Sequence, residues 1–121
     1  MAYIYMVRCT DGSLYTGIAK DLGKRMQEHY HRKKQGAKYT KSRQVRSLEM
    51  VWETDEWSHA AKLEFWIKQL RKTQKEELIC HPEKVNELSV FLQQGIVYSP
   101  HADYRLEMYL EKTALQGEEP E

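Results

Sequence analysis

The sequence has few cysteines, and their positions exclude the structures that cysteine usually supports. Of 121 residues only Cys9 and Cys80 are cysteine, and they lie far apart. No C-x-x-C pair occurs, and no histidines stand at zinc-finger intervals from either cysteine. A disulfide framework and a cysteine-based zinc site are therefore excluded. We expect both cysteines to be buried free thiols.

Long hydrophobic runs are also absent. The N-terminal stretch MAYIYMV is apolar, but it reaches Arg8 after seven residues and no basic segment precedes it. This pattern fits neither a signal peptide nor a membrane-spanning helix. We expect a cytoplasmic protein that has no membrane partner.

The chain has little net charge, +1 at neutral pH, but the charge is unevenly distributed. Residues 1–46 contain eleven Lys or Arg and three acidic residues, so this segment carries +8 and residues 47–121 carry −7. Such asymmetry predicts that the first half binds a polyanion. The hydrophobic content of 40% excludes a disordered chain, and the length fits one domain with one core.

A β-hairpin is predicted near the N-terminus. Residues 3–8 and 14–18 are short runs rich in aromatic and β-branched residues, and a turn signal separates them. The length of the turn decides which way the tyrosines of the two strands point, because side chains alternate along a strand. Two registers are possible.

If Asp11 and Gly12 form a two-residue turn, Tyr5 and Tyr15 point to opposite faces of the sheet. A three-residue loop that ends with Gly12 in the left-handed conformation places both tyrosines on one face instead. We expect the three-residue loop. Gly17 then lies opposite Tyr5 and leaves space beside its ring. The other face of the hairpin becomes core: Ile4, Met6, Leu14 and Ile18.

A basic helix should follow the hairpin. Asp21 is a good N-cap for a helix over residues 22–33. Arg25 and His29, four residues apart, share one side of this helix. Its other side is apolar: Leu22, Met26 and Tyr30.

The rest of the chain predicts one more strand and several helices. A strand is expected near residues 47–53, because apolar residues alternate there with charged or smaller ones. The next helix is expected to pack on the sheet through a stripe of Leu63, Trp66, Ile67 and Leu70. Its expected N-cap is Ser58. Three further helices are expected to begin at a capping box from Thr73 to Glu76, at Pro82, where the helix would run to Gly95, and at Ser99-Pro100.

Residues 31–46, HRKKQGAKYTKSRQVR, form a predicted basic loop with seven Lys or Arg and no acid. A basic cluster with interleaved tyrosine suits a nucleic-acid phosphate backbone. The predicted nucleic-acid-binding residues are Lys24 on the first helix and, from the loop, Arg32, Lys33, Lys34, Lys38, Tyr39, Lys41 and Arg43.

Glu64 is the most informative single residue, because it lies at the border of the apolar stripe of the packing helix. A partly buried carboxylate needs an arginine, several donors or a metal ion. The alternative is an ordinary ion pair with Lys68 on the same helix. The sequence leaves both interpretations open.

Taken together, these residues resemble the GIY-YIG nuclease superfamily. Tyr3-Ile4-Tyr5 stands where that family has GIY, and Tyr15-Thr16-Gly17 stands where it has YIG. Arg25 matches the family's helical arginine, His29 a histidine of many members, and Glu64 the metal-binding glutamate. The small stand-alone bacterial (UPF0213-like) members share the patterns DGSLYTGI, GAKYT and E-x-x-I-K. The resemblance covers roughly residues 2–80.

The resemblance implies an α+β fold with a three-stranded antiparallel sheet flanked by helices, followed here by extra C-terminal helices. It divides the chain into a nuclease-like core over 1–80, a helical extension of the same domain over 81–116 and a frayed tail over 117–121. It implies a metal-dependent DNA endonuclease, with Mg²⁺ or Mn²⁺ as cofactor and branched, damaged or single-stranded DNA as possible substrates.

The resemblance also assigns roles to residues. Glu64 would hold the metal, Arg25 would grip the scissile phosphate, and Tyr15 would take or relay the proton of the attacking water. Tyr5 would lie beside the phosphate, and His29 is an alternative base.

Two departures from larger family members favour a second hypothesis. Ile18 stands where the excision-repair nuclease UvrC has a lysine, and no asparagine follows Glu64 at the spacing of the larger enzymes. The alternative is therefore a nucleic-acid-binding module that keeps the fold with little or no catalysis.

Overall fold

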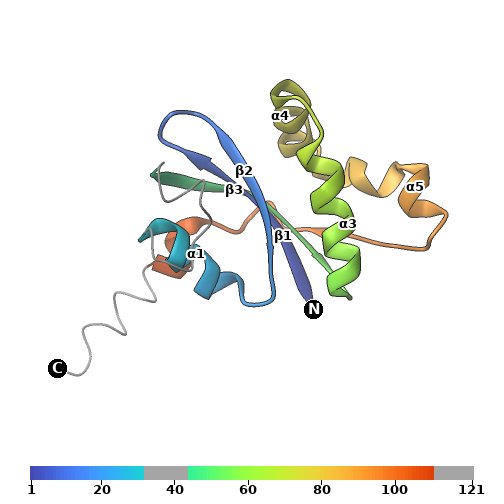
Figure 1. Cartoon of the computed structure of the whole chain (residues 1–121), viewed down its shortest axis with the longest axis horizontal. Coiled ribbons are helices and arrows are strands. Elements are labelled where there is room, and N and C mark those ends of the chain that lie inside the picture. Colours follow the sequence, from blue (N-terminus) through green and yellow to red (C-terminus); the bar gives the residue numbers. More distant parts are fainter. Residues whose placement is uncertain (32–43, 111–121) are drawn as a thin grey trace.

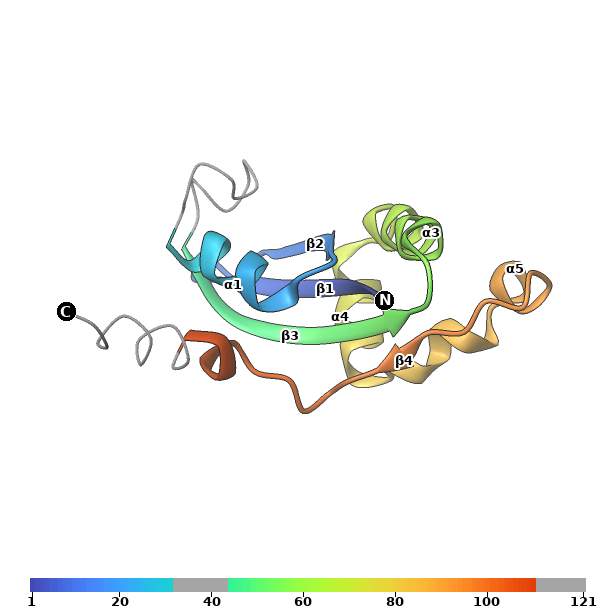
Figure 2. The same ribbon diagram turned by 90° about the horizontal axis from the view of Figure 1, so that it is seen from below.

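The computed structural model describes residues 1–31 and 44–110. Within this part of the chain, helices cover both faces of an antiparallel sheet whose strand order is β2-β1-β3-β4 (Figures 1 and 2). The elements are β1 (Ala2–Cys9), β2 (Leu14–Ala19), α1 (Leu22–Tyr30), β3 (Val45–Thr54), α3 (Trp57–Lys68), α4 (Lys72–Cys80), η1 (Pro82–Glu87), α5 (Ser89–Leu92) and β4 (Ser99–Pro100), followed by helical residues 106–110.

The predicted α+β fold is confirmed, with one addition to the predicted three-stranded sheet. Ser99 and Pro100, expected to start a helix, instead form β4 and pair with Glu53 and Trp52 of β3. Proline is tolerated there because an edge strand leaves one side of its backbone unpaired. The last helix begins at residue 106, after a turn.

The hairpin has the predicted three-residue register. Tyr5 lies opposite Gly17, and Val7 lies opposite Tyr15. Gly12 has a φ of +86°, the left-handed conformation that closes the loop, and its N–H donates to the carbonyl of Cys9 at 2.9 Å. The two-residue alternative is therefore excluded, and both tyrosines lie on one face of the sheet.

Each sheet face has its own core. The face of Ile4 and Met6 packs on α3, α4, η1 and α5 through Leu63, Ile67 and other buried residues. The face of Tyr5 and Val7 packs instead on α1 and on the C-terminal helical turn through Leu22, Met26 and Leu106. Since α1 and α3 pack against opposite faces of the sheet, residues from both helices can meet only around the edge strand β2.

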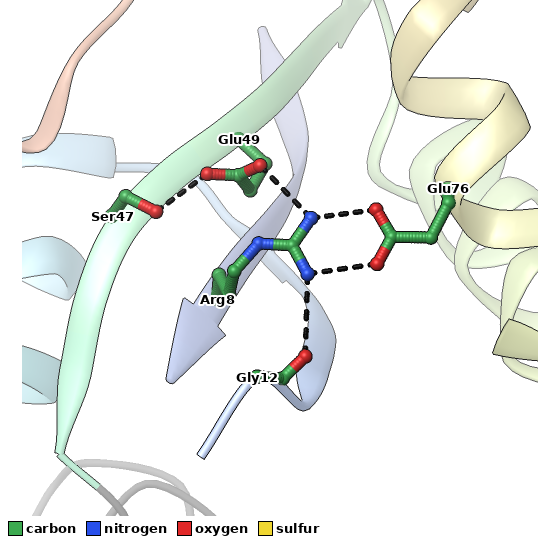
Figure 3. Close-up of polar contacts among 5 residues, drawn as sticks. All are labelled: Arg8, Gly12, Ser47, Glu49 and Glu76. Carbon is green, nitrogen blue, oxygen red and sulfur yellow. Dashed lines mark hydrogen bonds and ion pairs between the residues drawn. The ribbon is translucent and has the colours of Figure 1, made fainter. Parts of the chain in front are cut away.

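A bulge in β3 allows one partly buried arginine to join four parts of the chain. Met6 pairs with Met50, but Val7 pairs with Leu48, so Glu49 is left out of the ladder. Figure 3 shows the result. Arg8 donates to both carboxylate oxygens of Glu76 on α4, at 2.8 and 2.6 Å, to Glu49 at 3.1 Å and to the carbonyl of Gly12 at 3.2 Å. The bidentate arginine lowers the pKa of Glu76. This network fixes the hairpin loop against α4.

Several predicted helix starts were wrong, and for Glu76 and Ser99-Pro100 a tertiary contact gives the reason. Glu56, not Ser58, is the N-cap of α3. The N-cap of α4 is Arg71, whose N–H donates to Gln74 Oε1 at 2.9 Å. The predicted capping box does not form, since its glutamate is the Arg8 partner described above.

Three further expectations need correction. Helix α1 ends at Tyr30 rather than residue 33. The single helix predicted from Pro82 to Gly95 is a 3₁₀ helix and a short α-helix, because Leu88 between them is extended. Cys9 is buried as expected, but Cys80 is exposed. Within the described ranges, no helix has both the length and the apolar character needed to cross a membrane.

Candidate active site

Helix α1 brings its basic residues over the hairpin tyrosines. The side chain of Asp21 accepts a hydrogen bond from the Lys24 N–H at 3.0 Å, so the predicted N-cap is confirmed. Leu22 and Met26 are buried against the sheet. Because Arg25 and His29 occupy the neighbouring side of the helix, they are directed toward Tyr5.

The hydroxyl group of Tyr5 joins both residues. It lies 2.6 Å from His29 Nε2, and Arg25 Nε donates to it at 3.3 Å. A guanidinium can only donate, so the Tyr5 oxygen accepts from Arg25 and its own proton is available to donate to His29. Tyr5 and His29 are both fully buried. Sequence reasoning had placed His29 on a basic surface, whereas the structure places it inside.

Burial keeps both groups uncharged near neutral pH. Burial raises the pKa of Tyr5 well above its usual range, although the Arg25 hydrogen bond and charge act in the opposite direction. Burial, together with the nearby Arg25 charge, lowers the pKa of His29 to about 4. The pair is therefore a neutral phenol beside a neutral imidazole.

Tyr15 has a different environment. Its side chain is only partly buried. The centroid of its ring lies 6.4 Å from that of Tyr5 and 5.5 Å from that of His29. The ammonium of Lys68 lies 5.4 Å from the same ring. Of the two hairpin tyrosines, Tyr15 is the one that a substrate can reach.

Arg25 is held by a residue that sequence reasoning did not select. Glu28 accepts a hydrogen bond from Arg25 Nη1 at 3.0 Å, and its side chain is only 10% exposed. With Tyr5 on one nitrogen and Glu28 on another, the guanidinium is fixed in orientation. The i, i+3 spacing from Arg25 was the available signal in the sequence.

Glu64 reaches the same region from α3. Its ion-pair partner Lys68 has its ammonium 5.4 Å from the ring centroid of Tyr15, which places Glu64 near the tyrosine cluster. The Glu64 carboxylate lies 3.2 Å from Lys68 Nζ, and its side chain is 22% exposed. The predicted ion pair is therefore present. Because Lys68 is half exposed, the ion pair is weak, and another cation can replace Lys68 as the partner of Glu64.

The donor set fits a hydrated divalent cation. Among residues 1–31 and 44–110, no three His, Cys, Asp or Glu side chains group together, so this part of the chain offers no zinc-type cage. Glu64 supplies a single hard oxygen donor. Mg²⁺ keeps several waters and is commonly bound through one or two carboxylates plus substrate phosphate, which matches this arrangement.

The structure thus brings together Tyr5, Tyr15, Arg25, His29 and Glu64, although they come from four different elements. Lys24 is exposed on α1. The other predicted nucleic-acid-binding residues lie outside the described residues: Arg32, Lys33, Lys34, Lys38, Tyr39, Lys41 and Arg43.

A large concave region lies away from this cluster. A groove of about 540 Å³ between α3 and α5 is lined mainly by apolar residues, among them Phe65, Trp66 and Phe91. It contains none of the tyrosines and neither Arg25 nor Glu64. The size of this groove therefore does not identify the active site. The polar cluster at the β2 edge is the better candidate for it.

Comparison with known proteins agrees with this choice. Residues 1–77 match the family model of the GIY-YIG catalytic domain, a range that contains all five clustered residues. A UPF0213 protein of Fusobacterium nucleatum is 51% identical over 81 residues, covering 67% of this chain and 79% of that protein. One from Staphylococcus saprophyticus is 48% identical over 79 residues, covering 64% and 92%.

A solved structure is also similar in sequence. The solution NMR structure of a UPF0213 protein from Bacillus halodurans is 34% identical, with a TM-score of 0.44, and the match covers 74% of this chain and 98% of that one. The names of these relatives assign no activity.

Proposed function

This chain belongs to the GIY-YIG catalytic domain family, and we propose that it is a metal-dependent endonuclease that hydrolyses DNA phosphodiester bonds. GIY-YIG domains are nuclease domains, which act on nucleic acid and generally use divalent metal ions. The observation that carries the proposal is the arrangement around Tyr5. Its hydroxyl group orients Arg25 and is itself fixed by buried His29.

Arg25 is the proposed phosphate ligand. Hydrolysis builds negative charge on the phosphate oxygens, and a planar, permanently charged guanidinium can contact two of them. Tyr5 and Glu28 hold this group from either side, which reduces the entropy lost when substrate binds. In this arrangement Tyr5 is a positioning residue, and it is too buried to contact the phosphate directly.

Tyr15 is proposed to take or relay the proton of the attacking water, giving up its own hydroxyl proton to solvent as it does so. It is the partly exposed tyrosine of the cluster, and its ring lies beside the Lys68 ammonium. His29 is less suited to this role, because it is fully buried and its Nε2 is already hydrogen-bonded to the Tyr5 hydroxyl group. We assign His29 to the orientation of Tyr5 and Arg25.

Glu64 would hold the divalent cation, which we propose to be Mg²⁺ or Mn²⁺. The ion would stabilise the charge on the leaving 3′ oxygen and on the phosphate. Lys24 and the predicted basic residues between 32 and 43 would contact the DNA backbone without reading sequence. We propose residues 1–80 as the nuclease core and 81–116 as an extension of the same domain, since β4 joins the core sheet.

One observation favours the second candidate, a nucleic-acid-binding module with little catalysis. The carboxylate of Glu64 already has a cationic partner in Lys68. If a metal ion cannot displace that ammonium, the protein would bind DNA without cleaving it.

The cellular compartment and any role in DNA repair stay predictions.

Cleavage assays separate the two candidates. Purified protein is incubated with labelled duplex, single-stranded, flap and four-way DNA, with Mg²⁺ or Mn²⁺ and with a chelator. The endonuclease proposal expects cleavage of at least one substrate, which stops with chelator and is lost in Glu64→Ala. DNA binding without metal-dependent cleavage on any substrate would instead favour the binding module.

A further inference from the structure

Lys68, the last residue of α3, lies between the proposed metal ligand and the accessible tyrosine. Its Nζ is 3.2 Å from Glu64 Oε2 and 5.4 Å from the ring centroid of Tyr15. The lysine side chain is 48% exposed and the glutamate side chain is 22% exposed. A single ammonium therefore contacts two residues of the candidate site from the solvent side.

The charges around the Lys68 ammonium indicate what happens to it when a metal ion binds. Arg25 is paired with Glu28, and Lys68 is paired with Glu64, so these four charges balance. A divalent ion on Glu64 adds positive charge next to the Lys68 ammonium, and like charges a few ångströms apart repel. The ammonium must then leave the carboxylate. Its flexible four-carbon stem allows this movement without disturbing the helix.

We propose that Lys68 is a phosphate-binding residue of this site. Its ammonium neutralises Glu64 in the metal-free protein and contacts the scissile phosphate when a divalent ion takes its place. The inference rests on the proposed nuclease function. A phosphate bound between a Glu64-held metal and Arg25 would lie within reach of the displaced ammonium, because Lys68 Nζ already lies 5.4 Å from the Tyr15 ring centroid at this edge of the site.

The proposal predicts two effects of opposite sign in Lys68→Met, which keeps the stem and removes the charge. Mn²⁺ should bind the DNA-free protein about 2- to 5-fold more tightly, because it no longer has to displace the Lys68 ammonium from Glu64. This factor corresponds to the free energy of a partly exposed ion pair. Single-turnover DNA cleavage at saturating metal should slow at least about tenfold, because a phosphate contact is lost. Free Mn²⁺ is followed by electron paramagnetic resonance and cleavage by gel.

Two variants serve as controls. Lys68→Arg keeps the charge, so it should keep wild-type Mn²⁺ affinity and recover most of the cleavage rate. Lys62→Met removes a charge from the same helix, but the ammonium of Lys62 donates to Gln94 Oε1 at 2.7 Å and not to Glu64. It should match the wild type in both measurements. Circular dichroism confirms that each variant is folded.

The outcomes are distinguishable. If Lys68→Met matches Lys62→Met in metal affinity and cleavage, or if it weakens Mn²⁺ binding, the proposed role of Lys68 is wrong. Such a result would leave the nuclease proposal intact as long as the wild type binds metal and cleaves DNA. A wild type that neither binds Mn²⁺ nor cleaves any DNA would overturn the nuclease function, and the role of Lys68 with it.

Discussion

Tyr5 and Tyr15 are neighbours on one sheet face, yet their surroundings give them different tasks. The Tyr5 hydroxyl is buried and hydrogen-bonded to His29 and Arg25, whereas Tyr15 is partly exposed beside Lys68. Loss of the hydroxyl group should therefore have different effects at Tyr5, which holds other side chains, and at Tyr15, which is exposed to water. Removing each oxygen in turn therefore tests the division of roles.

We predict that Tyr15→Phe slows single-turnover DNA cleavage by about 10²-fold or more and leaves stability almost unchanged, because it removes the partly exposed hydroxyl group that is proposed to take or relay the proton. Tyr5→Phe should lower the free energy of unfolding by about 1–3 kcal/mol, because a buried His29 nitrogen loses its partner. Urea unfolding and cleavage rates measure both effects. The assignment fails if the stability loss is found in Tyr15→Phe instead.

His29 should make the stability of the protein depend on pH. Its folded pKa of about 4 lies below the ordinary histidine value of 6.5, so the unfolded chain binds this proton more readily. Stability is then fully present above about pH 6.5 and is lost as the pH falls toward 4. The His29 contribution between pH 7 and pH 5 is about 2 kcal/mol.

Urea unfolding of the wild type and His29→Gln at several pH values isolates this contribution from that of the other histidines. The variant starts from lower stability, since the site is packed. Its loss of stability between pH 7 and pH 5 should be smaller than that of the wild type by about 2 kcal/mol. Equal pH dependence in the two proteins would show that His29 is not buried as a neutral group.

At this scale the sequence predicted which residues lie together better than it predicted their surroundings. Tyr5, Tyr15, Arg25 and Glu64 lie together as the motif spacing implied. That His29 is buried, and that Glu28 holds Arg25, depends on how α1 packs against the sheet. Helical periodicity alone cannot show this, because it does not say which side of a basic helix faces the core.

The hairpin was the most predictable element, because one loop length explained several residues at once. Gly12 has the left-handed conformation that the register required, and Gly17 lies opposite Tyr5. Helix caps and the β3 bulge were less predictable. The Glu49 bulge serves Arg8, whose other partner Glu76 is 68 residues away along the chain. No local signal specifies such a long-range pair.

Gly17→Ala tests whether the hairpin register positions the site. An added Cβ would meet the Tyr5 hydroxyl oxygen, and it would lie 2.6 Å from Tyr5 Cζ and 3.1 Å from Tyr15 Cε2. Tyr5 is buried and cannot move without cost, so we expect a loss of about 1–3 kcal/mol in unfolding free energy. DNA cleavage should fall as well, because the ring that orients Arg25 shifts.

Gly23→Ala provides the matched control in α1. There the added Cβ approaches the partly exposed ring of Tyr109 at 3.2 Å, which has room to adjust. Alanine also favours a helix by up to about 1 kcal/mol. We expect unchanged or higher stability and full activity in this variant. Equal tolerance of alanine at both glycines would contradict the close packing of Tyr5 against the β2 backbone.

The whole molecule combines a polar site with a basic N-terminal part and an acidic remainder. Figure 2 shows how the chain after β4 runs along β3 toward the end of the sheet where α1 lies. Leu106 is buried there in the core that also contains Leu22 and Met26. The sequence predicted extra C-terminal helices but left open whether the last one completes the core or binds a partner.

The uneven charge predicts how DNA binding responds to salt. If Lys24 and the predicted basic residues between 32 and 43 contact about six phosphates, log affinity should fall with log salt at a slope of about −5. Lys24→Gln should reduce the magnitude of this slope by about 1, and Lys62→Gln on α3 should leave it unchanged. Fluorescence anisotropy with labelled DNA measures the slopes. A slope near zero would contradict binding through the phosphate backbone.

The most direct test of the account is the single-turnover rate of DNA cleavage in Mg²⁺ for the wild type and Glu64→Gln, each at saturating protein. Glu64→Gln removes the charge that we propose holds the metal and keeps the size of the side chain, and DNA affinity measured in parallel should not fall. The account predicts a loss of at least about 10²-fold in rate. Cleavage by Glu64→Gln at the wild-type rate, or wild-type cleavage that persists in chelator, would contradict it.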